Sequence, residues 1–178
     1  MKRTEYDNQV KKALEYFEKA SIVLTDDEKA NIEVADFGKG VVNEVGLQLV
    51  VYINTDRVCA KEMVLLPGQT CPEHMHVTTN GCQGKEETFR CRYGEVFLYV
   101  SGEKNTDNIK AVTPPTDITV FHEVVLKPGE QYTIMPETLH WFQAGPNGAV
   151  ISEFSTRSTD ETDVFTDKKI VRATVIED

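Results

Sequence analysis

The stretch "GQTCPEHMHVTTNGCQGKEETFRCRYGE", residues 68–95, decides the interpretation of the fold, because it holds two of the four histidines of the chain. His74 and His76 are separated by a single residue. In a β-strand, residues two apart point to the same face of the sheet. The two imidazoles are therefore predicted to lie side by side, shortly before a run of glutamates.

The segment "KEETFRCRY", residues 85–93, alternates in the same way. One face carries Lys85, Glu87, Phe89, Cys91 and Tyr93, and the other carries Glu86, Thr88, Arg90 and Arg92. The second face is polar and belongs in water, whereas the first is mainly apolar and belongs inside. A buried carboxylate is costly unless it is paired or binds a metal. Glu87, and not Glu86, is therefore predicted to be the functional acid.

A third imidazole lies far along the chain, His140 in "MPETLHWFQAG", where alternation places it on an apolar strand face. Three neutral imidazoles and one carboxylate suit a divalent transition metal such as zinc, manganese, iron, cobalt or nickel. An octahedral ion with four such ligands keeps positions open for a substrate. Taken singly, the residues have plainer explanations: exposed histidines, a strand register shifted by one residue, or a core histidine. Together, His74, His76, Glu87 and His140 favour a metal site.

From about residue 46 onward, short segments rich in β-branched and aromatic residues alternate with turn signals. The segments are "GLQLVVYI", "KEMVLL", "TFRCRYGEVFLYVSG", "DITVFHEVVL", "EQYTIM", "AVISEFS" and "KKIVRATVI". Turns at Pro67-Gly68, at Pro128-Gly129 and at "GPNG" (145–148) separate them. Many short strands without helical patterns between them predict an antiparallel sandwich or barrel. Each Pro-Gly turn precedes a segment that ends in histidine, as expected of a barrel with two similar halves.

The beginning of the chain has a helical pattern instead. One apolar stripe at helical spacing contains Val10, Ala13, Leu14 and Phe17. Thr25, with Glu28 three residues later, matches a capping box that opens a second, short helix. We expect a single domain over residues 1–178, with a helical extension at 1–45 packed on the outside of a β-barrel at 46–178.

The chain has 178 residues and a formal net charge of −10, which suits one globular domain with an acidic surface. Such a surface repels phosphate backbones, so neither nucleic acid nor an anionic membrane is expected as a partner. No apolar run reaches the length of a membrane span, and "MKRTEYDNQV" lacks an apolar signal-peptide core, so we expect a cytoplasmic protein. The four cysteines form no close CxxC pair and are expected to be small buried thiols.

The histidine-rich stretch resembles the first sequence motif of the cupins, G-x5-H-x-H-x3–4-E-x6-G. Its fixed positions are occupied by Gly68, His74, His76, Glu87 and Gly94. Ten residues, 77–86, separate the second histidine from the glutamate where the motif has three or four, so they are interpreted as a loop insertion. The second cupin motif, P-x-G-x-x-H, is only approximated by Pro136 to His140. The resemblance implies an all-β core folded as a cupin double-stranded β-helix (a jelly-roll barrel), with one or two N-terminal helices packed outside.

More specific matches point to one cupin family. Lys85 stands two residues before the ligand glutamate, as in the H-x-H…K-x-E stretch of the D-lyxose isomerases, and "SEFSTRSTDETDVFTD" is similar to their E-x-S…D-x-x-T-D segment. These matches cover about residues 62–168. The resemblance implies a D-lyxose ketol-isomerase that converts D-lyxose to D-xylulose, and also D-mannose to D-fructose, through a cis-enediol of a metal-held sugar. It further implies a divalent ion, manganese first, with zinc, cobalt or iron as alternatives.

The same resemblance assigns roles within the site. Glu153 in "AVISEFS" matches the E-x-S glutamate and is the candidate general base; the alternative is an exposed strand glutamate. Lys85 is the second catalytic candidate, placed to donate to a sugar oxygen; the alternative is a surface lysine on the inserted loop. Both side chains are expected to contact the sugar, and Asp163 is expected to hold a distal hydroxyl group. His122 is expected to be a structural histidine and not a ligand.

Three other functions are compatible with the same ligands: a cupin-type sugar-phosphate isomerase, an iron-dependent dioxygenase and a non-enzymatic sugar-binding cupin. A phosphorylated sugar needs a cationic cradle, but Arg90 and Arg92 are predicted to face outward. Oxygen chemistry does not need the acid–base pair, and binding proteins of this kind often lose ligands that are all present here. A small unphosphorylated sugar is therefore the expected substrate. The resemblance to cupins also implies a homodimer.

Overall fold

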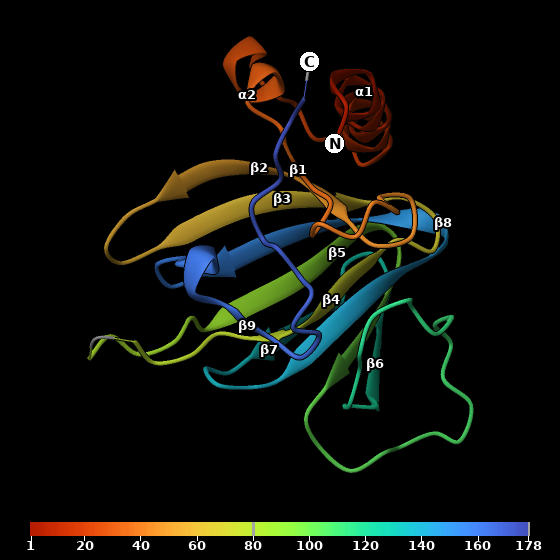
Figure 1. The fold of residues 1–178 in the computed structure, drawn as a ribbon, viewed down its shortest axis with the longest axis vertical. Coiled ribbons are helices and arrows are strands. Elements are labelled where there is room, and N and C mark those ends of the chain that lie inside the picture. The colour runs from red at the N-terminus through yellow and green to blue at the C-terminus, as the bar shows by residue number, and fades with distance from the viewer. Residues whose placement is uncertain (80, 178) are drawn as a thin grey trace.

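The computed structural model describes residues 1–79 and 81–177, which form two helices, nine strands and one 3-10 turn (Figure 1). The elements are α1 (Arg3–Lys19), α2 (Asp26–Ala30), β1 (Glu33–Ala35), β2 (Leu47–Asn54), β3 (Cys59–Leu65), β4 (Thr70–Met75), β5 (Glu87–Val100), β6 (His122–Leu126), β7 (Gln131–Ile134), β8 (His140–Ser155), η1 (Asp160–Thr162) and β9 (Val164–Phe165).

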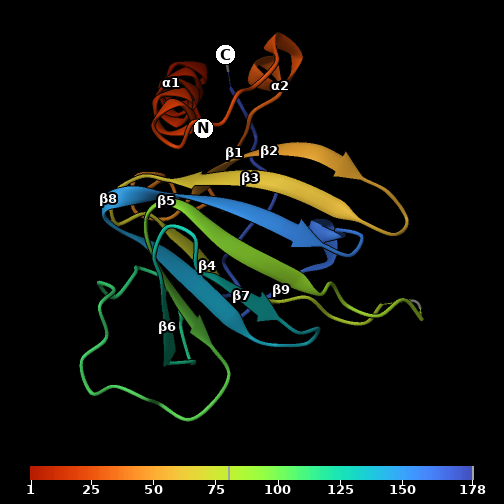
Figure 2. The same cartoon turned by 180° about the vertical axis from the view of Figure 1, so that it is seen from behind.

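The strands form one antiparallel sheet around two long strands, β5 and β8, which pair with each other along most of their length. The other edge of β5 pairs with β7 and then β6, and the other edge of β8 pairs with β3 and β4. β2 and β1 continue beyond β3, and β9 continues beyond β4. The sheet curls upon itself (Figures 1 and 2). It encloses a large cluster of buried apolar side chains. The predicted all-β core with helices on its outside is confirmed.

Both long strands bend where Gly94 and Gly148 meet. Each glycine has a positive φ, +72° and +73°, and a Cβ atom at Gly94 would overlap the carbonyl oxygen of Gly148. The pairing jumps here from Gly94 opposite Ala149 to Val96 opposite Ala144. The sequence predicted that "GPNG" (145–148) is a turn between two strands. It is instead a bulge within the single strand β8, because β5 continues alongside it.

The helices cover the outer face of the sheet near β2 and β3 (Figure 2). Ala13 and Phe17 of the predicted stripe are fully buried there. The predicted capping box of α2 is present: Glu28 N donates to Thr25 Oγ1 at 3.2 Å, and Thr25 N donates to Glu28 Oε2 at 2.7 Å. The predicted helical extension at 1–45 also contains a strand, β1, which pairs with β2. The single domain over residues 1–178 stays a prediction.

One side chain of β5 lies on the opposite face from the one predicted. A register shift between Cys91 and Tyr93 turns Tyr93 out of the barrel and onto α1, where its ring lies 5.9 Å from that of Tyr16 in an edge-on contact. Phe89 and Cys91, before the shift, point inward as predicted. The strict alternation of faces therefore holds only up to the bulge.

The last segment runs across the open end of the barrel (Figure 1). We call residues 163–177 the C-terminal strap. The predicted strand "KKIVRATVI" within it is wrong as a strand: only β9, at the beginning of the strap, pairs with a strand edge, and residues 168–176 contact loop backbone and side chains instead. Val171 N donates to Phe37 O at 3.0 Å, and Asp36 N donates to Thr174 Oγ1 at 3.0 Å.

Three of the four thiols are buried, as predicted, and all four are free. Cys82 is the exception, because it lies exposed in the loop between β4 and β5. Within the described residues, neither helix combines the length and the apolar character that a membrane crossing requires.

Candidate active site

Three of the histidines meet inside the barrel. His74 lies in β4, His76 follows directly after it, and His140 begins β8. Because His74 and His140 are opposite each other in the β4–β8 pair, their ring centroids approach to 4.3 Å. The His76 ring lies 4.9 Å from that of His74 and 5.3 Å from that of His140. All three are buried, and one ring nitrogen of each lies within 4.8 Å of the others.

Glu87 completes this group from the first position of β5. Its Oε1 atom lies 3.2 Å from Nε2 of His76 and 3.0 Å from Nε2 of His140. The described part of the inserted segment 77–86 forms no strand of its own, so it serves as the loop that returns the chain to the histidines. Glu86 is exposed, as predicted. The structure thus brings the four predicted metal ligands together.

The histidine rings are held from the side away from Glu87. Nδ1 of His74 lies 2.8 Å from Pro72 O, and Nδ1 of His140 lies 2.9 Å from Thr138 O. A carbonyl oxygen only accepts, so both Nδ1 atoms carry the hydrogen and both Nε2 atoms keep a lone pair. Nε2 of His140 is buried and, despite its approach to Glu87, forms no hydrogen bond among the described residues. Lone pairs directed beside a carboxylate fit a divalent transition metal.

Burial keeps the His74 ring neutral. It holds the pKa of His74 well below the usual value, and the neighbouring His140 and His76 rings act in the same direction. Only neutral imidazole is a metal ligand. The environment of His74 therefore favours the form that can bind an ion.

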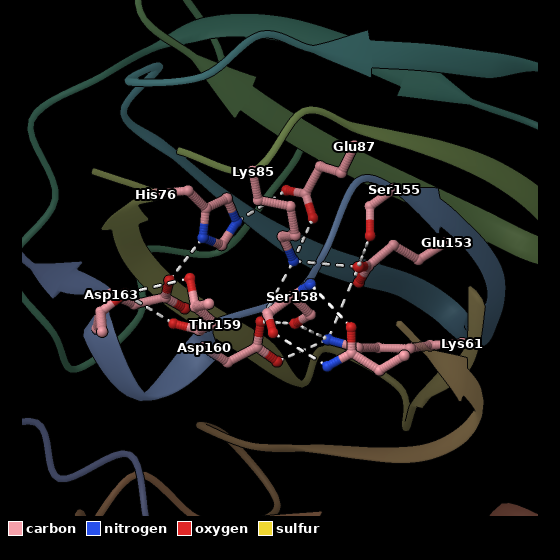
Figure 3. A network of polar contacts seen from close by, with 12 residues as sticks. Lys61, His76, Lys85, Glu87, Glu153, Ser155, Ser158, Thr159, Asp160 and Asp163 are labelled. Atoms are coloured by element: carbon pink, nitrogen blue, oxygen red, sulfur yellow. Dashed lines mark hydrogen bonds and ion pairs between the residues drawn. The ribbon is translucent and has the colours of Figure 1, made fainter. Parts of the chain in front are cut away.

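A buried pair of opposite charges lies beside His76 and Glu87, two of the predicted metal ligands (Figure 3). Nζ of Lys85 lies 3.0 Å from Oε1 of Glu153 and 2.8 Å from Oε2 of Glu87. Ser155 Oγ donates to the same Glu153 oxygen at 3.2 Å. Lys85 is 4% exposed and Glu153 is 2% exposed, so neither is the surface residue that the sequence left as an alternative. The two predicted catalytic side chains thus contact each other next to the predicted metal ligands.

A second lysine, which the sequence analysis missed, approaches Glu153 from β3. Nζ of Lys61 lies 3.7 Å from Oε1 of Glu153 and 2.6 Å from Oδ2 of Asp160, and it donates to Ser158 Oγ at 2.8 Å. Oδ1 of Asp160 lies 3.4 Å from Nζ of Lys85. Figure 3 shows the two lysines and the carboxylates as one continuous polar network.

The charges of this network set the protonation of its members. Burial disfavours charged lysine, but Glu153, Glu87 and Asp160 outweigh it and hold the pKa of Lys85 well above its usual value. Burial likewise opposes the Asp160 anion, but Lys85 and Lys61 hold the pKa of that carboxyl well below its usual value. Lys85 is therefore an ammonium group that donates hydrogen bonds and accepts no proton. Glu153 is left as the group that can act as a base.

Asp163 holds the remaining histidine. Its Oδ1 atom lies 2.6 Å from Nδ1 of His76, the bond that a carboxylate makes to orient a metal-binding imidazole. Burial opposes the charged ring, yet Glu87 and Asp163 together raise the pKa of His76 to about 9. Asp163 also lines the cavity at the site, and its contact with a sugar hydroxyl stays a prediction.

The chain has clear relatives among known proteins. Residues 15–178 match the family profile described as D-lyxose isomerase. The chain belongs to the D-lyxose isomerase family. It is 58% identical to the D-lyxose/D-mannose isomerase of Thermosediminibacter oceani, over 100% of this chain and 99% of that protein. It is 57% identical to the D-lyxose ketol-isomerase of Cohnella laeviribosi, over 99% of this chain and 98% of that protein. The predicted enzyme class, an aldose–ketose isomerase, is confirmed.

Solved structures of more distant proteins share the fold. An L-ribose isomerase of Cellulomonas parahominis superimposes with a TM-score of 0.75 at 18% identity, covering 99% of this chain and 98% of that one. An L-ribose isomerase of Acinetobacter sp. DL28, in complex with L-ribose, gives a TM-score of 0.76 at 16% identity with the same coverage. At these identities the likeness concerns the fold alone, and it confirms the predicted cupin barrel.

Lys61 and Asp160 belong to the polar network but were not predicted from the sequence, and they differ in whether the sequence could have revealed them. Lys61 in "CAKEMVL" shares its strand face with Cys59 and Met63, so it is a lysine on an apolar face, the same anomaly that singled out Lys85. Asp160 lies in "STDETD", which has the composition of a solvated loop and gives no such signal. His122 lies outside the ligand group, and its Nδ1 atom lies 2.8 Å from Glu103 O.

Proposed function

We propose that the chain converts D-lyxose to D-xylulose, and D-mannose to D-fructose as a second activity, by moving a proton between C1 and C2. The observation that carries this proposal is the buried Lys85–Glu153 pair against the group of three histidines and Glu87. An aldose–ketose isomerase needs a base that moves a proton between two adjacent carbons of the sugar, and a hydrogen-bond donor to the oxygens on those carbons. Glu153 and Lys85 supply these two groups. The named activities of the two close relatives support the choice of sugar.

His74, His76, His140 and Glu87 would hold the cofactor, a divalent ion, for which manganese is the first choice and zinc, cobalt or iron are alternatives. Such an ion, when bound, would supply Lewis-acid polarisation of the sugar carbonyl. The donor set itself is the support for this part of the proposal, since it consists of three imidazoles and one carboxylate.

The protein side chains perform the proton transfer. Glu153 removes the proton from C2 of the aldose and returns it to C1, while the hydroxyl proton of O2 passes to O1, so that a cis-enediol lies between substrate and product. Lys85 donates a hydrogen bond to the oxygen on C1 or C2 as negative charge develops there. Both side chains lie in a buried cavity, where their interactions with the sugar are stronger than in water.

An unphosphorylated sugar fits the charges better than a sugar phosphate. Arg90 is bonded to Gln131 on the outside of the sheet, and Arg92 is bonded to Ser152. The lysine and arginine side chains that line the cavity are Lys61, Lys85 and Arg172, and each already faces at least one carboxylate. A dianionic phosphate would have to displace these ion pairs, whereas neutral hydroxyl groups would not.

The test is to remove metal with a chelator, reload the protein with manganese, and follow D-lyxose and D-lyxose 5-phosphate. We expect D-xylulose only in the reloaded sample, and little conversion of the phosphate. His140→Ala should abolish both tight metal binding and turnover, whereas His122→Ala should preserve both. A protein that binds manganese but converts neither D-lyxose nor D-mannose would overturn the proposal, and oxygen uptake would then test the dioxygenase alternative.

The proposal also includes a homodimer in the cytoplasm. The dimer rests on the resemblance to cupins, and the location rests on the composition of the chain. Light scattering of the purified protein measures the first directly: a mass of one chain would contradict it.

A further inference from the structure

Two cavities share one wall at the site. An inner cavity of about 40 Å³ lies at the predicted metal ligands, and an outer cavity of about 310 Å³ lies beside it. Lys61, Asp160 and Arg172 line both. The inner volume offers room for only a few water molecules, whereas small-molecule sites usually measure several hundred Å³. A sugar bound at the metal ligands therefore needs the adjoining outer space.

The character of the walls gives the direction in which the sugar extends. The three residues shared with the outer cavity are all charged. The inner cavity also has an apolar wall made of Phe37, Leu47, Leu49, Met63, Phe142 and Phe165. Every carbon of an open-chain aldose carries an oxygen, and burying hydroxyl groups against apolar side chains is costly. The carbons beyond C2 are therefore best placed along the charged wall.

The sheet aligns the outer cavity with the base. Val51 lies opposite Lys61 in the β2–β3 pair, and Lys61 lies opposite Glu153 in the β3–β8 pair. Directly opposite residues of antiparallel strands share a face. Glu153, Lys61 and Val51 are therefore neighbours in one row across the three strands. Because Val51 lines the outer cavity, this row leads from the candidate base into that cavity.

We propose that the outer cavity is the subsite for the distal end of the sugar, and that Val51 limits the room for a sixth carbon. Arg172 is bonded to Glu33 through Nη1, while its Nη2 atom lies 3.6 Å from Oδ2 of Asp160, longer than a hydrogen bond. The guanidinium group therefore keeps donors, and the Asp160 carboxylate keeps lone pairs, with which they can bond to sugar hydroxyls. This inference rests on the proposed function. D-mannose differs from D-lyxose by one further hydroxymethyl group at the distal end, so the subsite sets the preference between the two sugars.

The test compares two tryptophan variants on the same strand, Val51→Trp and Ile53→Trp. Val51 is 44% exposed and Ile53 is 47% exposed, but Ile53 follows a register shift, lies opposite Ala60 and faces away from Lys61. We expect Val51→Trp to lower kcat/KM for D-mannose about tenfold more than for D-lyxose, the scale of one excluded carbon. Ile53→Trp should leave both values unchanged. Thermal unfolding of each variant confirms that it is folded.

Val51→Ala and Val51→Phe extend the test if the tryptophan variant does not fold. They should shift the ratio of D-mannose to D-lyxose activity in opposite directions, upward for alanine and downward for phenylalanine. An unchanged ratio, the same shift in Ile53→Trp, or a wild-type protein that converts D-lyxose but no D-mannose would overturn the inference. Failure of the proposed function is a separate result, in which the metal-loaded wild type converts neither sugar.

Discussion

Nζ of Lys85 lies 3.0 Å from Oε1 of Glu153, although 68 positions separate the two residues in the chain. The loop between β4 and β5 delivers the lysine, and the end of β8 delivers the glutamate. Because Lys85 is held as an ammonium group, the pair consists of a fixed donor and a carboxylate that can accept a proton. Because the two residues have different roles, substituting each of them is expected to change activity in a different way.

Lys85→Met is expected to lower kcat about 100-fold, because it removes the donor that stabilises charge on the sugar oxygens. Lys61→Met is the matched control, since it removes the same charge from an equally buried position farther from Glu153. It should act mainly on KM. Steady-state kinetics with D-lyxose distinguish the two, and equal losses of kcat would contradict the role of Lys85.

Asp163→Asn is expected to weaken metal binding about 10- to 100-fold, because the charged partner of His76 Nδ1 is lost. Titration with manganese after chelator treatment measures the dissociation constant. Glu86→Gln, an exposed carboxylate of the same region, should leave it unchanged. An unaltered affinity in Asp163→Asn would show that Asp163 does not support the ligand.

Asp160→Asn is expected to reduce the free energy of unfolding by about 3 kcal/mol at neutral pH, because the buried ammonium group of Lys61 loses a half-buried carboxylate partner. The pKa of Asp160 is lowered in the folded state, so its stabilisation is present above the unfolded value of about 3.9 and is lost as pH falls through the folded value. Urea unfolding of metal-free protein should therefore show a constant difference between wild type and variant from pH 5 to 7. That difference should shrink below about pH 4; the same difference at pH 3.5 and at pH 7 would be inconsistent with this linkage.

Gly94→Ala is expected to destabilise the barrel by about 3 kcal/mol, through a positive φ and an overlap with the backbone of Gly148. Gly129→Ala is the control, because its φ is also positive, at +92°, but no atom lies within 4 Å of the added carbon. It should cost only about 1 kcal/mol. Equal losses in urea unfolding would mean that the bend does not depend on the close approach.

The fold could be predicted where the alternation within one strand determines which face each side chain occupies. It could not be predicted where the register with a neighbouring strand determines this. Alternation placed Glu87, Phe89 and Cys91 correctly, but the bulge that turns Tyr93 outward depends on the register with β8. The same register makes "GPNG" a bulge and not a turn between strands. Residues 168–176 of the strap resemble a strand in composition, yet they pair with no strand, and composition does not report which strand edges are free.

The site was predictable to the extent that burial left an anomaly in the sequence. Glu87 and Lys85 stood out as charges on an apolar face, and Lys61 shows the same anomaly on β3. Asp160 shows none, because it comes from a loop whose composition suits solvent. Its place between Lys61 and Lys85 is a consequence of the tertiary fold alone.

The central claim is that Glu153 moves the proton between C1 and C2, and proton NMR in heavy water tests it most directly. Manganese-loaded wild type and Glu153→Gln are each incubated with D-lyxose, and manganese content is measured in both. We predict equal manganese content, D-xylulose from the wild type with any solvent deuterium at C1 only, and at least about 100-fold slower conversion by the variant. Conversion at the wild-type rate by Glu153→Gln, with no deuterium in either product, would contradict the account. Loss of manganese from the variant would show instead that Glu153 is a ligand.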